Sequence, residues 1–562
     1  MAPKVENSPR IGLFICQCGN EISQYIDVHE LEQTAKSLPN VAWVEISPYP
    51  CSKTGLADIK VAIKEHDLDR IVVAGCTPRT HEPLFRAACE EGGLNKFLFD
   101  MVNIRDQCAW VHSEEKIQAT KKAKDLIRMG VAKVSLLKAK EEVEIPVIPC
   151  ALVIGGGISG MAAALSLARA GFPVKLVEKE KKLGGLTRGL YKLYTTSKQG
   201  SDLVEEHIEA VNRNSNIELF LNAEVTEISG WVGNYNVTIS SPEKTIEHTI
   251  GVIILATGAR LFEPEGLFGY DGKKVITQYQ LEHNLLKGKF NARNIVMIQC
   301  VGSRDETRPY CSRICCMTAV KNAILIKQND PNLKVSIFFR DLQTFGDTYR
   351  ADLKQAKELG VAFMRYDPTK KPEVCGKVVK IHDELSNENL EIPYDLVVLS
   401  TPLVSHSDAM ALSEILGLPL DENNFFVETK VKLRPRNYIP RGIYLCGCCH
   451  WPADTQKSVF QAYNAASRAI DLLMQKKVKS EAFIVEDVDV EKCIGCGLCE
   501  SLCQFGAIRL ELQEGGKKAK VFPADCKGCG ICGASCPQQA IIMQYFTNEE
   551  LIAQVNNAFV ED

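Results

Sequence analysis

Eight cysteines near the C-terminal end of the chain form two runs with the same spacing, C-x2-C-x2-C-x3-C. Thiolates at this spacing bind [4Fe–4S] clusters, and the fourth cysteine of each run ligates the cluster of the other run. Four cysteines can also bind zinc, but two runs with this paired spacing favour two clusters. The expected ligand sets are Cys493, Cys496, Cys499 and Cys536 for one cluster, and Cys526, Cys529, Cys532 and Cys503 for the other.

A glycine-rich turn lies further towards the N-terminus, after the short apolar run Ala151–Ile154. Gly155, Gly157 and Gly160 match G-x-G-x-x-G and precede a segment rich in alanine and leucine. At a strand-to-helix turn, such glycines allow the tight turn, the approach of a pyrophosphate and the packing of helix on strand. A second apolar run ends at Glu178, where a carboxylate can accept a ribose hydroxyl. A turn that served only packing would not need this acidic residue, so the pattern predicts a dinucleotide site.

Two further motifs indicate which dinucleotide binds. Leu183-Gly184-Gly185-Leu186 follows the acidic residue, and Ala256-Thr257-Gly258 ends an apolar strand. In this order both motifs resemble those of the thioredoxin-reductase-like flavoproteins, which have two dinucleotide domains and bind FAD. In that group a later strand ending in glycine supplies a second contact to FAD. The expected FAD-binding residues are therefore Gly155, Gly157, Ile158, Ser159, Gly160, Glu178, Lys179, Gly184, Gly185, Leu186, Ala256, Thr257, Gly258, Gly447 and Asp454.

A third cysteine group follows the apolar strand Asn294–Ile298, where thioredoxin-reductase-like proteins carry a second glycine loop for NAD(P)H. This chain has no second G-x-G-x-x-G there, so we expect no nicotinamide site at this place. Cys311 and Cys315 are four residues apart, which predicts that they share one face of a helix, with Cys316 beside it. Cys300, at the strand end, could complete a [4Fe–4S] site; a redox dithiol is the alternative.

The first part of the chain alternates between expected strands and helices, and cysteines follow several of the strand ends. In α/β sheets, ligands bind in loops after the carboxyl ends of strands. The spacing of these cysteines is not a standard cluster motif, so buried packing and cluster ligation both stay open. For Cys89 and Cys108, in segments that look helical, the packing role is favoured. The candidate ligands of a further cluster are Cys16, Cys18, Cys51 and Cys76.

These motifs need structural elements that hold them in place, and the order of those elements predicts the fold class. Alternating strands and helices indicate an α/β architecture, and 562 residues suggest about three or four domains. We expect an N-terminal α/β domain over residues 1–142. A thioredoxin-reductase-like FAD domain with two dinucleotide folds and the inserted cysteine motif should cover residues 143–478. An α+β ferredoxin domain of the bacterial 2[4Fe–4S] type should cover residues 479–562.

The composition is that of an ordinary globular protein, with 45% hydrophobic and 24% charged residues and a formal net charge of −4. This charge balance predicts no nucleic-acid partner. No apolar run approaches the roughly 18 residues of a membrane span, and the polar residues 1–10 do not resemble a signal peptide. We therefore expect a cytoplasmic protein. In a reducing compartment, clustered cysteines indicate metal ligands or redox thiols rather than structural disulfides.

Together the motifs resemble the A-type subunit of heterodisulfide reductase, which carries flavin and iron–sulfur clusters, over essentially the whole chain. The resemblance rests on the flavin loop, both terminal cysteine runs, Cys300–Cys316, C-Q-C-G at residues 16–19 and G-C-T-P-R-T-H-E-P at residues 75–83. It implies an oxidoreductase whose FAD splits electron pairs, one electron going to a disulfide and the other to ferredoxin. It also implies cluster ligation by Cys300, Cys311, Cys315 and Cys316. In addition it points at Lys321 as a catalytic residue near flavin N5 that tunes the flavin potential by charge.

The resemblance implies partners as well. They are heterodisulfide reductase subunits B and C, ferredoxin, and a hydrogenase or formate dehydrogenase-type donor docked through a small iron–sulfur adaptor, with a homodimer inside the larger complex. Longer family members insert a further ferredoxin domain after the position of Gly184-Gly185; residues 186–217 contain no cysteine, so that domain is missing here. Two alternatives stay open: a self-contained disulfide reductase that uses cysteine thiols and NAD(P)H, and a passive electron-transfer module.

Overall fold

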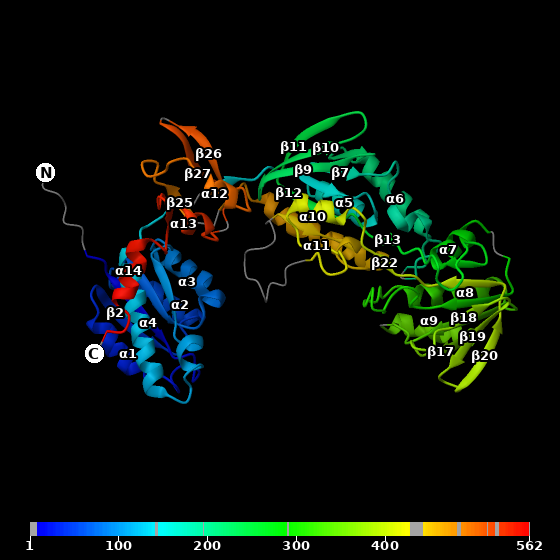
Figure 1. Cartoon of the computed structure of the whole chain (residues 1–562), viewed down its shortest axis with the longest axis horizontal. Coiled ribbons are helices and arrows are strands. Elements are labelled where there is room, and N and C mark those ends of the chain that lie inside the picture. Colours follow the sequence, from blue (N-terminus) through cyan, green and yellow to red (C-terminus); the bar gives the residue numbers. More distant parts are fainter. Residues whose placement is uncertain are drawn as a thin grey trace. The chain divides into compact units, whose positions relative to one another are not determined.

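The computed structural model describes residues 8–140, 144–194, 196–288, 291–344, 346–427, 442–479, 485–513, 515–522, 526 and 528–560 (Figure 1). The chain divides into two compact units. One unit is Ile145–Val478, and the other combines Met1–Glu144 with Lys479–Asp562. The first and last parts of the chain therefore share a unit, although the flavin motifs separate them in the sequence. Within the described residues, no helix has both the length and the apolar character needed to cross a membrane.

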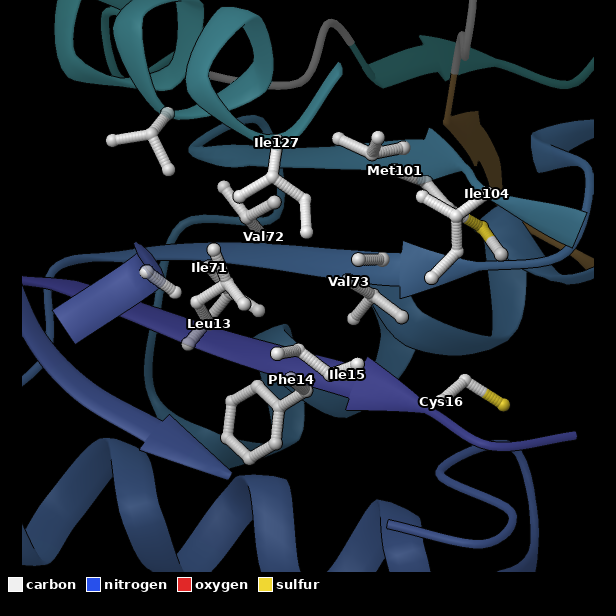
Figure 2. Packing of buried hydrophobic residues seen from close by; sticks show 14 of the residues in the cluster. Leu13, Phe14, Ile15, Cys16, Ile71, Val72, Val73, Met101, Ile104 and Ile127 are labelled. Atoms are coloured by element: carbon white, nitrogen blue, oxygen red, sulfur yellow. The ribbon is translucent and has the colours of Figure 1, made fainter. Parts of the chain in front are cut away.

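A parallel sheet of four strands forms the centre of the N-terminal segment. Its order is β2 (Val41–Ser47), β1 (Ile11–Cys16), β3 (Arg70–Gly75) and β4 (Phe99–Asn103). Every residue of β1 is buried, as expected for a strand covered on both faces. Figure 2 shows Val72 packed near Ile127, with Cys16 at the end of β1. The helices here are α1 (Val28–Ser37), α2 (Lys53–Glu65), α3 (Pro78–Gly92) and α4 (Lys116–Leu136).

The C-terminal segment adds antiparallel strand pairs and short helices to the same unit. The pairs are β25 (Val485–Val488) with β28 (Ile541–Met543), and β26 (Ile508–Gln513) with β27 (Gly516–Val521). The helices are α12 (Leu498–Leu502), α13 (Ile531–Ser535) and α14 (Asn548–Asn556). Helix α14 packs against α4 (Figure 1), and the Tyr545 hydroxyl donates to the Phe97 carbonyl at 2.9 Å. The C-terminal segment is thus fixed to the N-terminal core by packing and by hydrogen bonding.

The unit Ile145–Val478 contains a first parallel sheet that carries the glycine loop. Its order is β23 (Ile443–Leu445), β12 (Val252–Leu255), β6 (Ala151–Ile154), β7 (Val174–Glu178) and β8 (Ile217–Leu221). Helices α5 (Ile158–Arg169) and α11 (Thr455–Met474) pack on this sheet and on each other, and α6 (Gly200–Arg213) packs on α5. The antiparallel strands β9 (Glu224–Trp231), β10 (Asn234–Ser240) and β11 (Thr245–Ile250) lie between β8 and β12 in the sequence.

A second parallel sheet in this unit has the same strand-and-helix construction. Its order is β14 (Val275–Thr277), β21 (Leu396–Leu399), β15 (Asn294–Ile298), β16 (Lys334–Phe339) and β17 (Ala362–Arg365). The helices of this region are α7 (Gln278–Leu286), α8 (Cys315–Asn329) and α9 (Asp347–Glu358), and an antiparallel sheet of β18 (Glu373–Cys375), β19 (Val378–Asp383) and β20 (Glu388–Pro393) adjoins it. Two dinucleotide-type sheets in one unit confirm the predicted thioredoxin-reductase-like α/β fold.

One local prediction is wrong. Cys311 does not share a helix face with Cys315, because α8 begins at Cys315 and Cys311 lies in the loop before it. Arg313 between them has a left-handed backbone, with φ of 59°, which a right-handed helix cannot contain. The loop, and not helical spacing, therefore determines the position of Cys311.

Candidate functional site

A cavity of 410 Å³ lies in the unit Ile145–Val478, where the glycine loop meets α7 and α8. Among the residues predicted to bind FAD, Gly160 and Gly447 do not line this cavity. The lining includes all the others: Gly155, Gly157, Ile158, Ser159, Glu178, Lys179, Gly184, Gly185, Leu186, Ala256, Thr257, Gly258 and Asp454.

Backbone geometry explains why the loop needs its glycines. Gly155 has φ of +107°, and a Cβ there would overlap the Ala256 carbonyl. A Cβ at Gly160 would overlap the carbonyl oxygen of Gly155, so this third glycine serves the packing of helix α5 on the loop. By contrast, the Cβ position of Gly157 meets open space, and α5 begins directly after it with no side-chain cap from the described residues. Free N–H groups at a helix start beside open space fit the pyrophosphate of FAD.

Glu178 is buried at the end of β7 and lines the cavity. Its carboxylate accepts the Gly156 N–H at 2.6 Å and the Glu180 N–H at 2.8 Å. These bonds hold the carboxylate beside the glycine loop, and a carboxylate has further lone pairs for a ribose hydroxyl. Lys179, the next residue, donates to the Asp408 carboxylate at 2.7 Å, so its charge is compensated within the protein.

Gly447 and Asp454 lie just before helix α11 and have different roles. A Cβ at Gly447, where φ is +74°, would overlap the Ser159 hydroxyl, so this glycine allows the loop after β23 to pack on α5. Asp454 is the N-cap of α11, and its carboxylate accepts the Lys457 N–H at 2.8 Å. Its side chain is 3% exposed and is also paired with the Lys457 ammonium at 3.1 Å. The carboxylate therefore stabilises the helix start at the cavity wall.

A buried ion pair forms another part of the cavity wall. Lys321 Nζ donates to Glu282 Oε1 at 2.6 Å, and the side chains are 10% and 2% exposed. The second Glu282 oxygen accepts the Tyr191 N–H at 2.9 Å. Burial lowers the pKa of Lys321, and the Glu282 carboxylate opposes this change. The charge of Lys321 therefore depends on a carboxylate that holds it beside the cavity.

One face of helix α8 lines the same cavity. Cys315, Thr318 and Lys321 follow one another at intervals of three residues, which places them on neighbouring turns of one face. Cys315 is also one of the predicted cluster ligands. Helix α8 therefore carries residues of both the predicted flavin site and the predicted cluster site.

The third cysteine group gathers at the carboxyl edge of the second sheet. Cys300 follows β15, and Cys315 and Cys316 begin α8, the next helix. Burial raises the pKa of Cys315 well above its ordinary value, and the neighbouring thiols of Cys316, Cys300 and Cys311 raise it further. In a dinucleotide fold this junction of strand end and helix start holds a pyrophosphate. Here thiols occupy it, beside an α8 start that no described side chain caps, which suits an anionic cluster.

Buried polar atoms without partners lie next to this cysteine group in the chain and in the sheet. The Gln299 side chain is 1% exposed, and neither its oxygen nor its nitrogen has a hydrogen-bond partner among the described residues. Arg340 follows the neighbouring strand β16, and its buried Nε also has no hydrogen-bond partner among the described residues. Buried polar groups in folded proteins nearly always have a partner. A further group at this sheet edge, such as a cluster sulfur, would supply an acceptor.

The N-terminal cysteines come together after β1 and β3. The Cys18 N–H donates to the Cys16 sulfur at 3.2 Å. Burial raises the pKa of Cys16 to about 12, and the thiols of Cys18, Cys51 and Cys76 also raise it. Arg105 Nη1 donates to the Cys18 sulfur at 3.6 Å. The structure therefore brings the four candidate ligands into one group with a cationic neighbour.

Small cavities in the C-terminal segment are lined by the remaining predicted cluster ligands. The sulfurs of Cys493, Cys503 and Cys536 accept backbone N–H groups at 3.5, 3.3 and 3.3 Å. The last cysteine of each run lies with the first three of the other run. One cavity is lined by Cys493, Cys496, Cys499 and Cys536, and another by Cys503, Cys526, Cys529 and Cys532.

No three His, Cys, Asp or Glu side chains of the described ranges come close enough together to hold a single metal ion. Ligation of iron by the four cysteine groups therefore stays a prediction that the grouping supports. Cys89 and Cys108 lie apart from these groups, fully buried in the N-terminal core.

The sequence patterns missed three charged residues of these sites, namely Glu282, Arg105 and Arg304. Glu282 lies in the polar-looking segment Gln278–Leu286, and only the spacing to the buried Leu285, three residues later, indicates that it faces inward. Arg105 follows no motif and contacts a cysteine that is distant in the chain. Arg304 lies within the Cys300–Cys316 stretch, but its contact with Cys300 depends on an irregular loop that spacing does not predict.

Comparison with known proteins agrees with this geometry. The family model for pyridine nucleotide-disulphide oxidoreductases matches residues 150–298, and the model for the 4Fe-4S dicluster domain matches residues 474–550. A solved structure of similar fold is thioredoxin reductase of T. acidophilum, which is 19% identical with a TM-score of 0.41 and covers 58% of this chain and 100% of its own. The chain is thus an iron–sulfur flavoprotein oxidoreductase of the disulfide-reductase class.

Curated relatives narrow this class. An iron-sulfur subunit of CoB–CoM heterodisulfide reductase from Methanopyrus kandleri, of the A type, is 36% identical, with 99% of each chain covered. The A-type subunit of H2:CoB-CoM heterodisulfide,ferredoxin reductase from Methanothermobacter marburgensis is 35% identical, with 98% of each covered. The chain belongs to this family of A-type heterodisulfide reductase subunits, which confirms the resemblance seen in its motifs. The first alignment spans 653 residues although this chain has 562, so that relative contains segments that are absent here.

Proposed function

We propose that this chain divides electron pairs between two acceptors within a heterodisulfide reductase complex. One observation carries the proposal: Cys315 of helix α8 lines the flavin cavity and also belongs to a predicted cluster ligand set. A cluster held by Cys315 would therefore lie beside the flavin, and helix α8 alone would connect the two sites. When bound, FAD accepts two electrons and can release them singly, which matches the one-electron capacity of iron–sulfur clusters.

The proposed cofactors are one FAD and four [4Fe–4S] clusters. Two clusters would lie in the C-terminal segment, one at Cys300, Cys311, Cys315 and Cys316, and one at Cys16, Cys18, Cys51 and Cys76. In functional terms we divide the chain into residues 1–142, 143–478 and 479–562.

Each flavin-site residue has a definite task in this proposal. The backbone of Gly157 and the start of α5 bind the phosphates, and Glu178 orients the ribose. Lys321 holds a positive charge at the cavity wall, where it would favour the reduced, more negative flavin. Glu282 holds that lysine in position through the 2.6 Å ion pair.

The proposed partners are subunits B and C, ferredoxin, a hydrogenase or formate dehydrogenase-type donor with its iron–sulfur adaptor, and a second copy of the chain. The name of one relative supports ferredoxin, since this relative from Methanosarcina acetivorans is the A subunit of a ferredoxin/F420H2-dependent CoB-CoM heterodisulfide reductase. The alignment with the Methanopyrus kandleri relative spans 653 residues, whereas this chain has 562, so segments of that relative are absent here. Electrons for ferredoxin would therefore have to leave through the four cysteine groups of this chain.

Cofactor analysis tests the proposed cluster number. Anaerobically purified protein should contain one FAD and about 16 iron atoms, four for each cluster. Iron and flavin content, together with spectra of the reduced clusters, measure this directly. A content of about 12 iron atoms would show that one of the two cysteine groups outside the C-terminal segment holds no cluster. A content of about 8 would show that neither does, and Cys311, Cys315 and Cys316 would then be candidate redox thiols.

A second test concerns the self-contained disulfide reductase. NADH or NADPH alone should reduce the bound flavin more slowly than about 1 per second, the low end of enzyme turnover rates. The reason is that Cys300 and its loop follow β15 where a nicotinamide-binding glycine loop would stand. Anaerobic stopped-flow absorbance gives the rate, and dithionite shows that the flavin is reducible. Rapid reduction by NADH would instead favour a dithiol reductase.

A further inference from the structure

An arginine side chain meets a cysteine sulfur in each of the cysteine groups that lie outside the C-terminal segment. Arg105 Nη1 donates to the Cys18 sulfur at 3.6 Å. Arg304 Nη1 donates to the Cys300 sulfur at 4.0 Å. The two contacts arise in different units of the chain, from unrelated stretches of sequence.

The backbone presents both sulfurs in the same way. Cys18 and Cys300 each follow a buried strand of a parallel sheet, β1 and β15. Each has a left-handed backbone, with φ of 49° and 60°. Residues other than glycine rarely adopt this conformation, and it persists where the surroundings require it. A turn of this kind directs each cysteine away from the axis of its strand and towards its arginine.

Arg105 is held in place by contacts besides the sulfur. Its Nε donates to the Asp106 carboxylate at 3.1 Å, and its guanidinium lies 4.5 Å from the centre of the Trp110 ring. Asp106 in turn accepts the Asn103 side-chain amide at 3.1 Å. The guanidinium is therefore oriented before any cofactor binds, so it loses little freedom when it serves a sulfur.

Arg304 is anchored by a similar arrangement. Its Nη1 also donates to the Asp341 carboxylate. The Arg304 carbonyl accepts Arg340 Nη1 at 2.8 Å, which fixes the backbone of the same loop and brings a second cation to it. Each arginine thus contacts both a carboxylate and a cysteine sulfur.

Reduction of an iron–sulfur cluster adds one negative charge, part of which resides on the sulfurs. Hydrogen bonds to those sulfurs and nearby positive charge stabilise the reduced form and raise the reduction potential. We propose that Arg105 and Arg304 are positioning residues that raise the potentials of the clusters at Cys16, Cys18, Cys51 and Cys76 and at Cys300, Cys311, Cys315 and Cys316. This inference rests on the proposed function, because it requires a cluster at both places.

The test is a redox titration of the full-length protein, followed by electron paramagnetic resonance, with Arg105→Gln and Arg304→Gln. Each variant should make one cluster signal at least about tenfold harder to reduce at a given potential, which for one electron is a shift of 59 mV to more negative values. The two variants should shift different signals, and the signals that neither variant moves serve as an internal reference. Iron content is measured on every sample.

Arg70→Gln is the matched control. Arg70 lies in the same N-terminal core but donates to the carbonyls of Val134 and Leu137 at 3.0 and 3.2 Å, so it should shift no signal. Arg105→Lys keeps the charge but loses the planar fork that donates to the Cys18 sulfur, so its signal should still move to more negative potential, by less than in Arg105→Gln. If the glutamine variant loses iron, the lysine variant decides: a potential equal to that of the wild type would overturn the proposal.

The outcomes separate this inference from the proposed function. Full iron content with unmoved signals in both glutamine variants would overturn the role of the arginines and leave the cluster assignment intact. Wild-type protein that lacks the corresponding iron would overturn the cluster assignment and the inference with it. A control variant that shifts the same signal as Arg105→Gln would show a general effect of lost charge and would also overturn the specific role.

Discussion

Gly160→Ala should reduce the affinity for FAD by about tenfold or more. A Cβ at this position would overlap the carbonyl oxygen of Gly155, so the loop or the start of α5 must move. Overpacking of a close contact costs about 1–3 kcal/mol, and 1.4 kcal/mol corresponds to a tenfold change in affinity. Titration of flavin-depleted protein with FAD, followed by flavin fluorescence, measures the dissociation constant.

Gly157→Ala separates binding from folding at the same loop. A Cβ at Gly157 meets open space, and φ of −71° is allowed for alanine, so the flavin-depleted protein should keep the thermal unfolding temperature of the wild type. FAD affinity should still fall, because the methyl group enters the space where the backbone must approach the pyrophosphate. Ser166→Ala, in the same helix but away from the cavity lining, should change neither quantity. Wild-type FAD affinity in Gly157→Ala would show that this loop does not hold the phosphates. Wild-type affinity in Gly160→Ala would show that the close contact with the Gly155 carbonyl oxygen does not shape the FAD site.

The glycine loop could be predicted from the sequence because its chemistry is local. Gly155 and Gly160 avoid overlap with the neighbouring strand end at Ala256 and with the Gly155 carbonyl oxygen, whereas Gly157 leaves open space for a ligand. The terminal cysteine runs are predictable because the first three cysteines of each run lie in one short segment and the motif assigns the fourth to the other run. The spacing of residues within one loop or one strand-to-helix turn therefore predicts their relative positions in the structure.

The parts that spacing could not predict depend on contacts between distant segments. Helical spacing placed Cys311 on a helix, whereas the left-handed Arg313 keeps it in a loop. Glu282 and Lys321 meet only because α7 and α8 pack together, and 39 residues separate them in the chain. No periodic pattern marks such a pair, because each residue alone looks like one on a solvated helix face. The pair is nevertheless more deeply buried than the Lys179–Asp408 pair, whose lysine lines the same cavity.

Lys321→Met should destabilise the unit that holds the flavin cavity by about 3–5 kcal/mol, the cost of breaking a buried ion pair by removal of one partner. It would leave the Glu282 carboxylate, whose side chain is 2% exposed, with the Tyr191 N–H as its remaining hydrogen-bond partner among the described residues. The double variant Lys321→Met with Glu282→Gln removes both charges and should recover most of this loss. Thermal unfolding of Lys321→Met, of Glu282→Gln and of the double variant forms, with the wild type, a double-mutant cycle, and additive effects would contradict the coupling.

The same variants predict how the flavin potential changes with pH. Burial lowers the pKa of Lys321 and Glu282 opposes this, so Glu282→Gln should lower the lysine pKa further. Below that pKa the lysine is charged, and Glu282→Gln should have a more positive flavin potential than the double variant Lys321→Met with Glu282→Gln, which carries neither charge. Above it the lysine is neutral, and the two potentials should converge. Lys327→Met is the matched control, because Lys327 lies on the same helix but donates to the carbonyls of Pro331 and Leu333. A potential in Glu282→Gln that equals the wild-type value at every pH would show that Glu282 does not control the charge of Lys321.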